Sequence, residues 1–211
     1  MGHEPLSRRL QELARDDAVR TLNELVARTE GRGIFFVVIL LCLPFCTPIP
    51  LPGLSNIIGL GLIILGIRML LRLPARLPRF IGARPWPAQR MEKLIHGSLR
   101  FLRWLERMVK PRRTVWLTHG WAIRLNAAIF TLMALLLALP IPPVMPLSNT
   151  LPAYAIILLS ASMMEEDGTS IWFAYGACAF TVAYFAFFFG VIIRFLIVFE
   201  ERILNFLRSL L

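Results

Sequence analysis

Two proline-rich segments interrupt otherwise apolar stretches of the chain, and they limit its fold more than any other feature. The first is PIPLPGLSN, residues 48–56, and the second is PIPPVMPLSN, residues 140–149. Proline removes a backbone donor and glycine loosens the chain, so neither segment continues a helix. Inside a membrane, such a break is tolerated only where it is buried in protein or lines a water-filled cavity.

The surrounding apolar blocks are those of a membrane protein. Of the 211 residues, 57% are hydrophobic and 17% are charged, whereas soluble domains have about 25% charged residues. The run from Ile171 to Phe199 exceeds the roughly 20 residues that a membrane-spanning helix needs. These blocks predict an all-α integral membrane protein with a long C-terminal transmembrane helix and amphipathic cytoplasmic helices.

Each break separates two apolar arms. The arms are Gly33–Cys46 and Ile57–Leu71 around the first break, and Asn126–Pro140 and Leu151–Met164 around the second. Each arm is shorter than a full span, so two helical hairpins are predicted for which full crossing and a re-entrant dip both remain open. Basic residues on both sides of the first hairpin place both of its ends in the cytoplasm.

The two hairpins are related to each other. A shift of 93 residues superimposes Pro50 on Pro143, Leu-Ser-Asn at 54–56 on Leu-Ser-Asn at 147–149, and Ile-Ile-Leu at 63–65 on Ile-Ile-Leu at 156–158. Interrupted hydrophobic segments at corresponding positions of a repeat are typical of transporters with a shared central site. If both hairpins start and end in the cytoplasm, residues 165–168 (EEDG) lie there too, but the charges of the C-terminal tail favour the opposite side.

The chain divides into five segments on this interpretation. They are amphipathic N-terminal helices, the first hairpin, a basic segment, the second hairpin, and the C-terminal helix with its tail, at residues 1–30, 31–73, 74–124, 125–168 and 169–211. Between residues 72 and 113, twelve Lys and Arg stand against two Glu, and this block is expected in the cytoplasm. Residues 90–110 carry an apolar stripe beside a basic face, the pattern of an interfacial helix. Nucleic acid is not an expected partner, because the block adjoins membrane segments.

Three motifs resemble the ExoD family of bacterial membrane proteins. They are IPLPGLSNIIGLGLIIL (49–65), LERMVKPRR (105–113) and ALPIPPVMPLSNTLPAYAIILLSASMMEEDG (138–168), in the family's order. Arg68 stands where the family leads one to expect Gln, and LRLPARLPRF (71–80) lacks an expected Trp. The resemblance implies a multi-pass protein of the bacterial inner membrane that is linked to exopolysaccharide production.

The candidate site residues lie at the breaks and near them. Freed backbone groups and Asn amides can hold an ion or a polar head group, Arg68 can grip a phosphate, and an acidic pair can relay protons or bind a cation. The full set is Pro50, Pro52, Gly53, Ser55, Asn56, Arg68, Asn149, Pro152, Glu166 and Asp167. Structural roles are the alternative, with Asn and Asp capping helices and Arg68 reaching to the interface. No catalytic motif, metal cluster or cofactor motif appears, and whether the chain is an enzyme stays open.

Two functions fit these features. The first is a small carrier or permeation unit for an ion or a lipid-linked phosphate, with its site between the two hairpins. The second is a non-catalytic scaffold or regulator of polysaccharide assembly that acts through the basic helix at 90–110. Expected partners are the lipid bilayer with its anionic lipids, and either a second copy of the chain or proteins of polysaccharide assembly.

Overall fold

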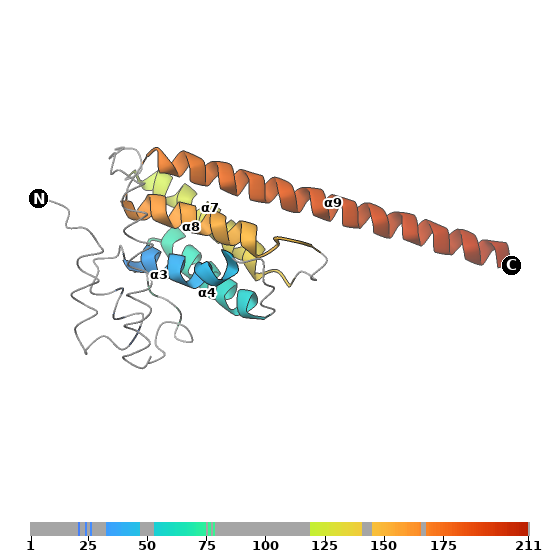
Figure 1. The fold of residues 1–211 in the computed structure, drawn as a ribbon, viewed down its shortest axis with the longest axis horizontal. Coiled ribbons are helices and arrows are strands. Elements are labelled where there is room, and N and C mark those ends of the chain that lie inside the picture. Colours follow the sequence, from blue (N-terminus) through green and yellow to red (C-terminus); the bar gives the residue numbers. More distant parts are fainter. Residues whose placement is uncertain are drawn as a thin grey trace, which may run out of the picture.

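The computed structural model describes residues 33–46, 53–74, 119–140, 145–165 and 168–210, together with residues 21, 24, 26, 76 and 78. In the last helix, side chains are described as far as Arg194. All regular structure in this part of the chain is helical, which confirms the all-α class there. Figure 1 shows α3 (Gly33–Cys42) with the short 3-10 helix η1 (Leu43–Cys46), α4 (Leu54–Leu70), α7 (Gly120–Ala138), α8 (Thr150–Glu165) and α9 (Ser170–Leu210).

Proline and glycine set most of the helix ends. The α-helix of the first arm ends at Cys42 and tightens into η1, which contains Pro44, because the residue before a proline avoids the α conformation. In the same way α7 ends at Ala138, two residues before Pro140. Pro152 lies in the first turn of α8, where its missing N–H would have had no partner in the helix.

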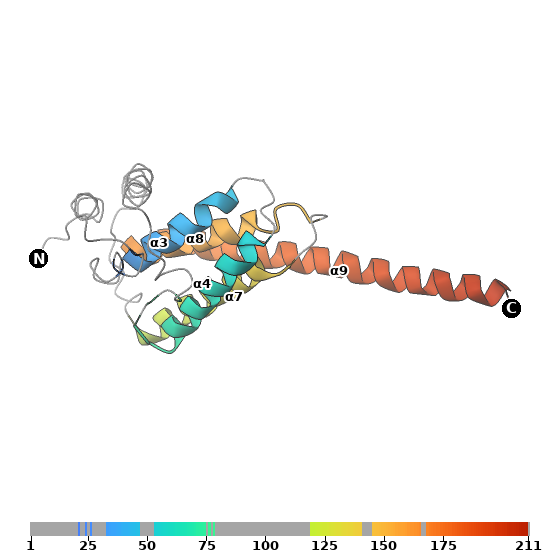
Figure 2. The same cartoon turned by 90° about the horizontal axis from the view of Figure 1, so that it is seen from below.

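The arms of the two hairpins pack across each other. α4 packs along α7, α3 packs on α8, and α8 also contacts α7 and α9. Figure 2 shows the α3–α8 pair and the α4–α7 pair as two layers. The largest fully buried side chains of the core include Phe36, Phe45, Phe130, Leu62 and Leu65.

Two helices have the length and composition to cross a membrane, over Gly120–Ala138 and Ser170–Arg194. Their outward faces carry large apolar side chains, with Trp121 58% and Phe173 72% exposed. Water would not favour so large an apolar surface, whereas hydrocarbon would. These helices are therefore compatible with a membrane protein, as predicted.

Other predicted elements stay predictions. α9 is one continuous helix, as expected for a long C-terminal helix. The interfacial helix at 90–110 lies outside the described residues. Of the N-terminal amphipathic helices, Thr21 and Glu24 are described, and each side chain accepts a hydrogen bond from the other's backbone N–H at 3.2 and 3.0 Å. This reciprocal pair is a capping box, which marks a helix start.

Candidate functional site

Both breaks lie at the same end of the bundle (Figures 1 and 2). A Cβ added at Gly59, near the start of α4, would lie 2.7 Å from Cβ of Ala138 at the end of α7. In the other pair, the Tyr154 hydroxyl near the start of α8 donates to the Cys46 carbonyl at the end of η1 over 3.3 Å. We call this end, formed by residues 43–46, 53–56 and 145–149, the break end.

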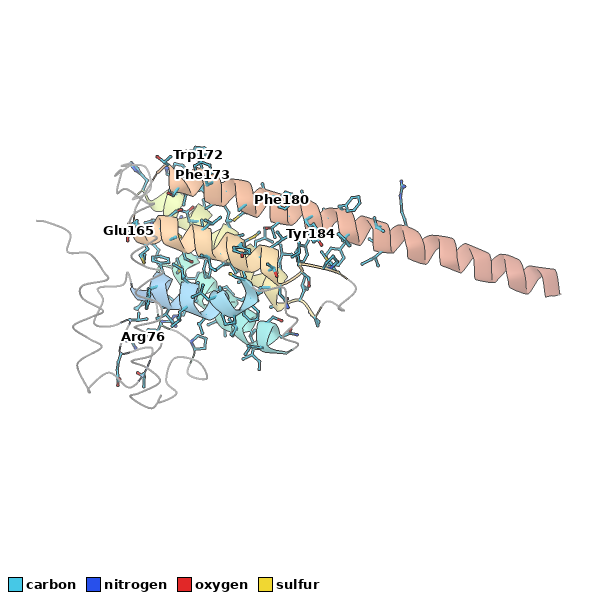
Figure 3. All side chains as sticks on the ribbon, in the orientation of Figure 1. Arg76, Glu165, Trp172, Phe173, Phe180 and Tyr184 are labelled. Atoms are coloured by element: carbon cyan, nitrogen blue, oxygen red, sulfur yellow. The ribbon has the colours of Figure 1, made fainter. Side chains whose placement is uncertain are left out.

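The opposite end carries charge. Arg68 and Arg72 lie at the end of α4, Arg124 lies in the second turn of α7, and Glu165 ends α8. Figure 3 shows Arg76 and Glu165 toward this end, with Glu165 the nearer of the two to the start of α9. We call it the arginine end. Residues 165 and 168 lie here too, so the second hairpin starts and ends on the same side of the bundle, which was one of the two predicted alternatives.

The first break brings Gly53, Ser55 and Asn56 into one turn. Gly53 takes a φ of 84° at the N-cap of α4 without a side-chain capping bond, a conformation that suits glycine. Ser55 is buried and its hydroxyl donates to Oδ1 of Asn56 over 3.2 Å. Because Gly53 is the N-cap, Asn56 lies inside the first turn of α4, and the predicted alternative that Asn56 caps this helix is wrong.

The second break has a similar backbone with different residues. Leu147 adopts a φ of 58°, one residue after the position that the 93-residue shift pairs with Gly53. Asn149 directly precedes α8, and its carbonyl accepts a hydrogen bond from Ala153 N–H at 3.2 Å. Pro152 is buried in the first turn of α8. Pro50, Pro52, Glu166 and Asp167 lie outside the described residues, so their predicted roles stay predictions.

Tyrosine and threonine hydroxyls donate hydrogen bonds to backbone carbonyls at the breaks and beside them. Tyr154 donates to Cys46, Tyr184 on α9 donates to the Pro146 carbonyl, and Thr181 donates to the Leu151 carbonyl at 3.5 Å. Figure 3 shows Tyr184 beside the second break. These partners were not predicted from the sequence, although hydroxyl side chains within apolar helices were the available signal.

Removing these hydroxyls tests the role of the capped carbonyls. We expect Tyr154→Phe and Tyr184→Phe each to lower the free energy of unfolding by about 0.5–1.5 kcal/mol, since each leaves a carbonyl without its donor. Hydrogen exchange should accelerate at the break amides and stay unchanged at the arginine end. Unchanged exchange and stability in both variants would contradict the capping role.

Arg68 and Arg72 have different tasks at the arginine end. Nε and Nη2 of Arg68 donate to the Pro74 carbonyl at 3.1 and 2.8 Å. This guanidinium therefore holds the segment that directly follows α4. Arg72 follows the C-cap with a φ of 56°, and its N–H and that of Leu73 bond to the carbonyls of Met69 and Arg68. This is a Schellman motif, whose left-handed position usually holds glycine and costs another residue about 1 kcal/mol.

The interface between the hairpins is tightly packed. A Cβ added at Gly66 would lie 2.3 Å from Oγ1 of Thr131, and the pairs Gly59–Ala138 and Gly66–Thr131 advance by seven residues in opposite directions. α4 and α7 are therefore antiparallel at close range. Under the 93-residue shift, Gly59 corresponds to Pro152 and Ala138 corresponds to Phe45. Pro152 lies on α8 and Phe45 on η1, and these two helices also contact each other. This correspondence supports the repeat.

Few polar side chains lie inside the described bundle. Asn126 on α7 is buried and accepts a 2.5 Å hydrogen bond from the Tyr175 hydroxyl on α9. Ser160 is the described buried side chain whose oxygen has no hydrogen-bond partner. Among the described residues no group of His, Cys, Asp and Glu could hold a metal ion.

Comparisons with known proteins agree with the motifs. The family model described as "Exopolysaccharide synthesis, ExoD" matches residues 6–187. Protein ExoD of Rhizobium meliloti (strain 1021) is 32% identical over 167 residues, which is 79% of this chain and 69% of the relative. An uncharacterized protein of Synechocystis sp. is 26% identical over 167 residues, 77% of each chain. No solved structure matches. The family model and the first relative cover most of the chain, and this protein therefore belongs to the ExoD family of proteins associated with exopolysaccharide synthesis.

Proposed function

We propose that this protein is a non-catalytic membrane scaffold or regulator of exopolysaccharide assembly that acts through its basic segment. The observation that supports this most is the separation of charge along the bundle. In α3, α4, α7 and α8 every charged side chain belongs to the arginine end, and the interior between the hairpins is mostly apolar and closely packed. Such an interior suits a rigid body better than a path for a polar solute.

The charges also support an orientation in the bacterial inner membrane. Residues 72–113 carry a net +10, and the chain enters this segment from α4 and leaves it into α7 at the arginine end. By the positive-inside rule the arginine end faces the cytoplasm and the break end faces outward. The basic segment would then meet cytoplasmic proteins of polysaccharide assembly and the anionic inner leaflet.

Complementation of a strain that lacks the protein tests the proposal. We expect Arg100, Arg103 and Arg107 changed to Glu to reduce exopolysaccharide to the level of the deletion strain, because the reversed charges would repel the partner. The same three positions changed to Lys should keep most of the activity. Asn56→Ala with Asn149→Ala should complement fully. Equal amounts of each variant in the membrane fraction are the control.

A second function, the carrier for an ion or a lipid-linked phosphate, is favoured by the crossed packing of the two related hairpins, which suits a site between repeats. The carrier predicts the reverse result in the complementation test. The double variant Asn56→Ala with Asn149→Ala would fail to restore exopolysaccharide, whereas the variant with Arg100, Arg103 and Arg107 changed to Glu would restore it. In a chain without its native cysteines, Asn56→Cys or Asn149→Cys would also react with an impermeant thiol reagent from both sides of the membrane. Labelling from one side or from neither would favour the scaffold.

A further inference from the structure

Two arginines, one just after α4 and one on α7, lie at one corner of the arginine end. The guanidinium of Arg72 lies against the start of α7, where a Cβ added at Gly120 would be 2.0 Å from Nη2 of Arg72. Arg124 follows Gly120 by one helical turn, so its side chain leaves the same face of α7. Both side chains are exposed, and among the described residues neither forms an ion pair. The corner therefore concentrates positive charge that the described part of the chain does not neutralise.

This corner borders an apolar surface. Exposed large apolar side chains lie next to the two arginines on both helices: Leu70, Leu71, Trp121, Ile123 and Leu125. Tryptophan beside arginine is typical of the boundary between hydrocarbon and head groups. In a membrane the two guanidinium groups would thus lie at head-group depth, with lipid chains against the neighbouring side chains.

We propose that Arg72 and Arg124 bind the phosphate of an anionic lipid head group. Each guanidinium offers paired N–H donors that match phosphate oxygens, and the positive end of α7 adds to the attraction. Arg72 also occupies the left-handed position that favours glycine, which is understandable if its side chain is needed at this corner. The inference requires that the protein lies in a membrane but is independent of whether it is a scaffold or a carrier.

Lipid retention by the purified full chain tests the site. Phosphatidylglycerol and phosphatidylcholine are added in equal amounts to the detergent-solubilised protein, and bound lipid is counted by native mass spectrometry. We expect the wild type to retain phosphatidylglycerol preferentially and Arg72→Gln with Arg124→Gln to retain at least fivefold less. Gly120→Ala keeps both charges but displaces the Arg72 guanidinium, and it should lower retention at least twofold. Arg194→Gln is the control, because Arg194 lies on α9 about 28 Å beyond Tyr175. Its loss removes one positive charge and should leave phosphatidylglycerol retention unchanged.

Two further measurements separate this role from a structural one. Arg72→Gly should raise the melting temperature in zwitterionic detergent, because it relieves the left-handed conformation, while it lowers phosphatidylglycerol retention. Millimolar inorganic phosphate should not displace the lipid, since the chains contribute to binding; displacement would assign the site to free phosphate instead. Equal retention of both lipids by the wild type, or unchanged retention in the double variant, would overturn the proposal.

Discussion

Replacing Gly59 by alanine is expected to destabilise the bundle by about 2–3 kcal/mol, which is large for the addition of one methyl group. The added Cβ would lie 2.8 Å from both Cα and N of Ala138. A flexible side chain could move aside, but here the backbone of α7 is the obstacle. The helices must separate, and the separation weakens the close contacts along the whole α4–α7 interface.

The matched control is Gly176→Ala in α9. A Cβ at Gly176 meets nothing within 4 Å, so this change should stabilise the protein by up to about 1 kcal/mol through helix propensity alone. Unfolding of both variants in mixed micelles, followed by circular dichroism, gives the two free energies. If Gly59→Ala is as stable as Gly176→Ala, α4 and α7 are not in close contact.

The positions of α4 and α8 were predicted well from the sequence because local chemistry decides them. The arm predicted at Ile57–Leu71 is α4 at Leu54–Leu70, and the arm at Leu151–Met164 is α8 at Thr150–Glu165. Proline lacks a donor wherever it occurs, so a break can be recognised without knowledge of the fold. The starts of both helices lie slightly earlier than predicted, because Asn56 and Thr150 belong to the first turns.

The pairing of the helices could not be predicted in the same way. In α3, α4 and α8 apolar residues surround the helix, so periodicity does not show which face is buried. Gly59 and Gly66 were the available signal, since their seven-residue spacing matches that of Thr131 and Ala138 on α7. Arg68 was predicted to grip a phosphate or to reach the interface, and its bonds to the Pro74 carbonyl became visible only in three dimensions.

The hydrogen bond between Asn126 and Tyr175 is expected to contribute about 1–2 kcal/mol to stability, the upper part of the range for polar pairs between membrane helices. Tyr175→Phe would leave the buried Oδ1 of Asn126 without the donor that lies 2.5 Å away. Asn126→Leu removes the acceptor, and the double variant removes both. A double-mutant cycle on the unfolding free energy isolates the pair, with an expected coupling of about 1–2 kcal/mol.

This pair is one of the contacts that attach α9 to the rest of the bundle. α9 has 41 residues, and three side chains in its first fifteen residues, Tyr175, Thr181 and Tyr184, donate hydrogen bonds to other helices or loops. Of the three, the bond of Tyr175 joins two side chains and reaches α7 directly. If it matters, hydrogen exchange at the start of α9 should accelerate in Tyr175→Phe, while α3 stays protected. Additive effects in the cycle together with unchanged exchange would mean that apolar packing on α8 and the bonds of Thr181 and Tyr184 hold α9 in place.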